Sequence, residues 1–102
     1  MTERIYLDYN ATARIRPEVI ETMAETMASV GNASSVHGAG RDARKTVETA
    51  RKQVADLTGA TPDQVIFTSG GTEADNQAMA GTDPERTLVC AIEHPAVLDA
   101  SP

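Results

Sequence analysis

Aromatic residues, cysteine and lysine are all scarce in this sequence. Aromatic side chains make up 3% of its 102 residues and tryptophan is absent, so platforms for stacking nucleic-acid bases are few and any core is aliphatic. The single cysteine, Cys90, cannot form an internal disulfide, which indicates a reducing, cytoplasmic location. No group of cysteines and histidines has metal-ligand spacing, so we expect no bound metal.

Positive charge is also in short supply. Nine Lys and Arg against fifteen Asp and Glu give a net charge of -6, which repels nucleic-acid phosphates and anionic lipid surfaces. The sequence has neither the apolar core of a signal peptide nor a run long enough to span a membrane. We therefore expect no nucleic-acid or membrane partner. The length suits one modest domain and is too short for a two-domain enzyme.

Two amphipathic helices are predicted in the first sixty residues. Pro17 suits the first position of a helix, and Gly31 can supply the left-handed residue that ends it. The apolar stripe between them consists of Val19, Ile20, Met23, Met27 and Val30. A second stripe, closed by Gly59, consists of Ala43, Val47, Ala50, Val54 and Leu57. We expect the stripes to face a core, with a surface loop or helix entry over 31–40.

The second half of the sequence predicts a strand, a helix and a second strand. The β-prone run 65–68 comes first, a helix over 72–79 follows, and the apolar run 87–92 is the second strand. A right-handed crossover would make the strands parallel, which predicts an α/β fold in which helices pack on a parallel sheet. Cys90 would be a buried structural thiol in the second strand. Pro95 would open another helix.

The turn between the first strand and its helix carries the clearest chemical signal. A strand that passes through Gly70 and Gly71 into a helix leaves several amides unpaired at the helix N-terminus. Glycines allow close approach of a phosphate, the helix dipole favours its charge, and the hydroxyl of Ser69 or Thr72 can add a hydrogen bond. This predicts a phosphate-binding turn, although a plain helix cap by Ser69 or Thr72 fits the spacing equally well. The nucleoside-triphosphate loop pattern and the GxGxxG dinucleotide pattern are absent.

Four motifs in order resemble those of the cysteine desulfurases, in the class V aminotransferase group. They are Ile5-Tyr6-Leu7-Asp8-Tyr9-Asn10-Ala11-Thr12, Gly31-Asn32-Ala33-Ser34-Ser35-Val36-His37, Phe67-Thr68-Ser69-Gly70-Gly71-Thr72-Glu73-Ala74-Asp75-Asn76 and Glu93-His94-Pro95-Ala96-Val97-Leu98-Asp99. The resemblance covers nearly the whole chain. It implies the N-terminal part of a fold type I transferase that depends on pyridoxal 5'-phosphate, with 1–16 as an entry segment, 17–59 as a helical region and 60–102 as the start of the cofactor-binding α/β unit.

The resemblance also assigns roles to single residues. Gly71, through its amide, and Thr72, through its hydroxyl and amide, would bind the cofactor phosphate, and His94 would stack on the pyridine ring. Without the resemblance, His94 would be interpreted as a capping or surface histidine. Asn10 and Thr12 match a motif near the substrate entrance, but a simple turn explains them as well. His37 matches a loop near the active site, and Ser34 or Ser35 could instead cap the long helix.

The residues that would carry the covalent chemistry are not recognisable in these 102 residues. Lys45 and Lys52 lie on the predicted charged face of the long helix and match no Schiff-base motif, and Cys90 does not match the cysteine that accepts sulfur. We therefore expect the N-terminal part of an enzyme, incomplete for catalysis alone. The resemblance implies L-cysteine as substrate, a sulfur-acceptor protein, iron-sulfur or thio-cofactor assembly, and a homodimer at full length. A selenocysteine lyase or other class V enzyme, or a non-catalytic truncated product, remains an alternative.

Overall fold

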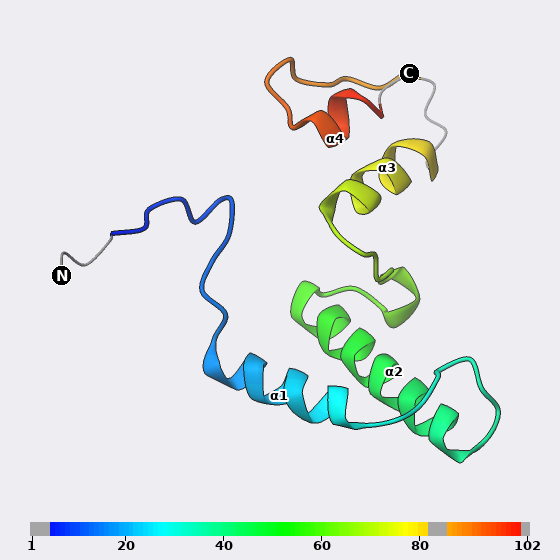
Figure 1. Ribbon diagram of the computed structural model, residues 1–102. Coiled ribbons are helices and arrows are strands. Elements are labelled where there is room, and N and C mark those ends of the chain that lie inside the picture. The colour runs from blue at the N-terminus through cyan, green and yellow to red at the C-terminus, as the bar shows by residue number, and fades with distance from the viewer. Residues whose placement is uncertain (1–4, 82–85, 101–102) are drawn as a thin grey trace. The chain divides into compact units, whose positions relative to one another are not determined.

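The computed structural model describes residues 5–81 and 86–100 and contains helices but no paired β-strand in those ranges (Figure 1). The chain forms two compact units, which divide within a helix between Ala50 and Arg51. In chain order the elements are α1 (Pro17–Ala28), α2 (Gly38–Thr58), a 3-10 turn η1 (Pro62–Gln64), α3 (Gly71–Gly81) and α4 (Pro95–Leu98). Helices are therefore confirmed at all the predicted places.

Helix α1 starts at Pro17 as predicted, but the prediction that Gly31 ends it is wrong. The helix stops at Ala28, where the amide and the hydroxyl of Ser29 donate to the Thr26 carbonyl at 3.1 and 2.6 Å. Gly31 is not in the left-handed region. A Cβ at this position would lie 2.4 Å from the Ala39 carbonyl oxygen. Glycine is needed at position 31 because the loop approaches the start of α2 closely, not because it ends α1.

The loop after α1 is attached to the first turns of α2 by side chains of the helix. Arg41 donates to the Val36 carbonyl at 2.7 Å, and Arg44 donates to the Ala33 carbonyl at 2.8 Å. His37 precedes α2, and its Nδ1 accepts from the Gly40 amide at 3.4 Å, so His37, not Ser34 or Ser35, caps this helix. At the other end Gly59 has a φ of 72°, which confirms the predicted left-handed stop.

The two apolar stripes do not face a core within the described residues, contrary to expectation. The α1 stripe ranges from 40% exposed at Val19 to 89% at Val30, and Leu57 of the α2 stripe is 86% exposed. The buried apolar residues are Ala55, which lies outside the predicted stripe, and Ala96. Ala43 and Ala50 of the α2 stripe are half-buried, but neither stripe is covered by a core in this part of the chain. The helical periodicity of a stripe shows which face is apolar and not what covers it.

The sequence predicted strands at 65–68 and 87–92, and neither is paired in the described chain. Val65 is extended, with φ and ψ of -99° and 121°, but Ile66 and Phe67 are 65% and 48% exposed, so the first run is not buried. The second run ends in a turn, and Cys90 is exposed, so its interpretation as a buried thiol is wrong here. Two parallel strands form a marginal sheet without further strands or helices to cover them.

The extent of uncovered apolar surface predicts how the isolated 102-residue chain behaves. We expect it to bind a hydrophobic dye such as ANS strongly and to melt over a broad temperature range, because no side chain larger than alanine is buried among the described residues. Dye fluorescence and thermal circular dichroism are the measurements. A sharp, cooperative transition of a monomer that leaves the dye dark would contradict this expectation.

Candidate phosphate and cofactor site

The N-terminus of α3 presents backbone donors outside the helical hydrogen-bond ladder. The first helical hydrogen bond at this end runs from the Ala74 amide to the Gly70 carbonyl, at 3.1 Å. The amides of Gly71, Thr72 and Glu73 precede it, so they have no carbonyl four residues back within the helix. The Thr72 hydroxyl is exposed beside them. This is the arrangement that binds phosphate and other anions at helix N-termini.

The two glycines of the turn are not explained by the backbone or by packing of this chain. Neither Gly70 nor Gly71 has a positive φ, and a Cβ built on either would meet no atom within 4 Å. At Gly31 and Gly40, in contrast, an added Cβ would lie only 2.4 and 2.3 Å from a backbone carbonyl oxygen, so close packing requires glycine there. Open space beside a glycine backbone suits the close approach of a bound group.

A carboxylate holds the residue before the glycines in place. Glu73 Oε2 accepts from both the amide and the hydroxyl of Ser69, each at 2.6 Å. These bonds, from the Ser69 side chain first and its amide second, lower the pKa of Glu73. On the other side of the turn the Thr68 hydroxyl donates to the Gly70 carbonyl at 3.1 Å. The conformation of the turn is thus held by its own side chains. Because both donors of Ser69 are bonded to Glu73, Ser69 is not available to bind a phosphate.

His94 caps α4 through one ring nitrogen. Its Nδ1 accepts from the Ala96 amide at 3.1 Å, so the proton of the neutral ring is on Nε2. This bond lies at the edge of the imidazole and leaves both ring faces available, and the residue is exposed. The short helix α4 contacts α3, so His94 belongs to the same unit as the turn. The capping role that local sequence favoured is present and is compatible with stacking.

The weaker candidates have local contacts of their own. Asn10 lies in a turn in which the Asp8 carbonyl accepts from the Ala11 amide at 3.2 Å, and it belongs with His37 to the first unit. Lys45 is exposed, and Lys52 pairs with Asp56 at 2.9 Å with both side chains about two-thirds exposed. Sequence reasoning missed Glu73, although a glutamate at the third position of a helix commonly bonds back to the residues that precede the helix, which was a usable signal.

Two wider features of the described ranges bear on the kind of site. Within 5–81 and 86–100, His, Cys, Asp and Glu side chains do not gather in threes to hold a metal ion. Among the same residues, no helix combines the length and the apolar character that crossing a membrane requires.

The class of protein follows from comparison with known families. The Aminotransferase class-V family matches residues 5–101, which includes the α3 turn and His94, so the chain belongs to this family. The resemblance inferred from the four sequence motifs is therefore confirmed.

Within this family, the relatives that the chain matches include several cysteine desulfurases. The chain is 46% identical to the IscS-like cysteine desulfurase of Mycobacterium tuberculosis, over 93% of this chain and 26% of that protein. It is 50% identical to a cysteine desulfurase of Sinorhizobium fredii, over 92% of this chain and 26% of the relative. A cysteine desulfurase IscS of Dictyoglomus turgidum is 42% identical, with coverage of 97% and 27%. The chain thus spans about a quarter of the length of the curated relatives it matches.

The contact between Ser69 and Glu73 should respond to pH. Because the folded chain lowers the pKa of Glu73, the contact is fully formed above the ordinary glutamate pKa and is lost as pH falls through the lowered value. We expect the Ser69 amide signal in a nitrogen-15 NMR titration to move over that acidic window. Glu73→Gln should abolish the response and Asp75→Asn, a matched change in the same helix, should preserve it. A Ser69 signal that follows Asp75 instead would contradict the assignment.

Proposed function

We propose that this chain supplies the phosphate-binding part of a pyridoxal 5'-phosphate-dependent cysteine desulfurase. The complete enzyme would convert L-cysteine and a protein thiol into L-alanine and a protein persulfide, and would pass the sulfur to an acceptor protein for iron-sulfur or thio-cofactor assembly. The observation that carries the proposal is the set of amides at Gly71, Thr72 and Glu73 that lie outside the α3 ladder, next to an exposed hydroxyl. Family membership and the names of the relatives support it.

The residues present fit the proposed cofactor. Gly71 and Thr72 would bind its phosphate through their amides, and the Thr72 hydroxyl would add a further hydrogen bond. The open space at both glycines leaves room for phosphate oxygens to approach the backbone. The Glu73 carboxylate is engaged with Ser69, so it shapes the turn rather than filling the phosphate position. Glu73 therefore has a structural role, and the amides of Gly71 and Thr72 have the binding role, because the donors of Ser69 are already bonded to Glu73.

His94 would hold the cofactor ring. The bond from the Ala96 amide fixes the imidazole at the start of α4 and keeps its faces free, so the ring can stack on an aromatic ligand. When bound, pyridoxal 5'-phosphate supplies the electron sink for reactions at the substrate's α-carbon. The Nε2 proton of His94 is the one that this chain can place near such a ligand. The residues here bind and orient, and they do not form a covalent bond.

The remaining parts of the enzyme are proposed on family grounds. The cofactor-binding lysine and the persulfide cysteine would lie in the three quarters of the relatives' length that this chain does not span. There, further strands would pair with 65–68 and 87–92 in a parallel sheet of a fold type I enzyme, with 1–16 as entry segment, 17–59 as helical region and 60–102 as the start of the cofactor unit. We also propose a homodimer and a cytoplasmic location.

The activity is tested on the protein encoded by the complete reading frame that contains these residues. We expect it to release alanine from L-cysteine when loaded with pyridoxal 5'-phosphate. Thr72→Val keeps the side-chain shape and removes one hydrogen bond to a charged group, so the cofactor should bind about tenfold more weakly or worse. Thr46→Val, a matched change in α2, should have no effect. A reading frame that yields no alanine but binds phosphate would favour a non-catalytic module, and alanine from selenocysteine alone would favour a lyase.

The role of His94 can be separated from its capping bond. Asparagine is a strong helix cap, so His94→Asn should keep the start of α4 while removing the ring, whereas His94→Ala should also cost about 1 kcal/mol of stability. We expect both variants to bind the cofactor more weakly in an equilibrium titration, and the alanine variant alone to melt at a lower temperature. If His94→Asn binds the cofactor as the unchanged protein does, then stacking by His94 is ruled out.

A further inference from the structure

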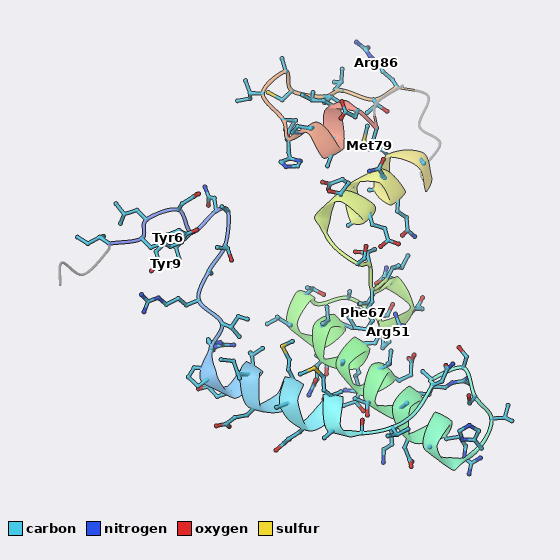
Figure 2. All side chains as sticks on the ribbon, viewed as in Figure 1. Tyr6, Tyr9, Arg51, Phe67, Met79 and Arg86 are labelled. Carbon is cyan, nitrogen blue, oxygen red and sulfur yellow. The ribbon has the colours of Figure 1, made fainter. Side chains whose placement is uncertain are left out.

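One side chain of α2 attaches the extended segment that leads into the α3 turn. Arg51 donates from Nη1 to the Val65 carbonyl. Its guanidinium carbon also lies 5.0 Å from the centre of the Phe67 ring, and Figure 2 labels both side chains. The contacts therefore reach two residues of the same segment from a single residue of the helix. Arg51 and Val65 are half-buried, so part of the pairing is shielded from solvent.

The chemistry of arginine suits this double contact. Its guanidinium is planar, with donors in the plane and two faces that can stack on aromatic rings. The hydrogen bond fixes the position of Val65 along the axis of α2. The ring contact restrains rotation of the segment at Phe67. The Val65 carbonyl and the Phe67 ring are only two residues apart in the segment, so a donor and a face of one guanidinium can reach both.

The attachment matters because the segment lacks strand partners in the described ranges. Ile66 and Phe67 are exposed, and at the start of the segment the Val65 amide donates to the Pro62 carbonyl, at 3.2 Å. From Phe67 onward the restraints are consecutive. Thr68 bonds to the Gly70 carbonyl, and Ser69 bonds to Glu73. Arg51 thus begins a series of contacts that ends at the unpaired amides.

We infer that Arg51 is a positioning residue for the phosphate site: by holding Val65 and Phe67 on α2, it sets where Gly71 and Thr72 present their donors. This inference rests on the proposed function, because the phosphate is the cofactor's. Arg51 does not touch the ligand. Its effect is transmitted through the segment 65–70, so it concerns the phosphate and not the pyridine ring.

The test compares two ligands that differ only in the phosphate, pyridoxine 5'-phosphate and pyridoxine. Both ligands are alcohols and not aldehydes, so neither can form a Schiff base with a lysine. Binding to a variant that carries a lysine in place of Arg51 can therefore be compared directly with binding to the unchanged protein. Their dissociation constants are measured by equilibrium titration of the cofactor-free protein from the complete reading frame. Arg51→Met should weaken the phosphorylated ligand about tenfold, the scale of one charge-assisted hydrogen bond, and leave pyridoxine unchanged. Arg51→Lys, which keeps a donor and a cation, should recover part of the loss.

Two further variants keep the inference falsifiable. Arg41→Met removes an arginine-to-carbonyl bond of the same helix, to Val36, and should not change the ratio of the two dissociation constants. Phe67→Leu removes only the ring contact, so it should weaken binding of the phosphorylated ligand less than Arg51→Met does. If Arg51→Met fails to fold, Phe67→Leu takes its place in the test. An unchanged ratio in Arg51→Met or, in its place, in Phe67→Leu overturns the inference, as does an equal loss in Arg41→Met. If the unchanged protein binds both ligands equally, the proposed function itself fails.

Discussion

The candidate site depends on the backbone donors that a helix leaves unpaired at its N-terminus. At α3 these are the amides of Gly71, Thr72 and Glu73, which precede the first helical bond from Ala74 to Gly70. Water can satisfy such donors, but a phosphate satisfies them and also benefits from the helix dipole. The side chains around these amides bond elsewhere: Ser69 donates to the Glu73 carboxylate and Thr68 donates to the Gly70 carbonyl, so neither occupies the three amides.

Capping by histidine is a second theme of the chain, and it relates structure to proposed chemistry. Both histidines, His37 and His94, precede a helix and accept an amide proton at Nδ1, at 3.4 and 3.1 Å. Each bond uses the edge of the ring. At α4 this leaves a restrained imidazole with free faces in the unit that contains the α3 turn. A structural role and a binding role are thus compatible in one residue, because they use different parts of it.

The uncovered apolar surface agrees with the extent of the family match. The stripe of α1 and the segments 65–68 and 87–92 have the periodicity or composition of buried elements, yet they are exposed in the described chain. The chain spans about a quarter of the length of its curated relatives, and in the proposed complete enzyme the remaining length would be available to cover such surfaces. The arginine attachment at Val65 and Phe67 holds in place a segment that has no strand partner among the described residues.

Sequence by itself determined the helices, their apolar faces, the family and the turn at Gly70 and Gly71, because local periodicity, proline and glycine punctuation and contiguous motifs are written in consecutive residues. It could not determine what covers the stripes or whether 65–68 and 87–92 pair, since both depend on distant partners. Only the tertiary structure showed that Gly31 serves a close approach to Ala39, that Glu73 occupies Ser69, and that Arg51 reaches Val65. The contacts of Gly31 and Arg51 join residues whose sequence separation carries no pattern, so geometry alone decides them, whereas the Glu73 contact had a local signal that sequence reasoning missed.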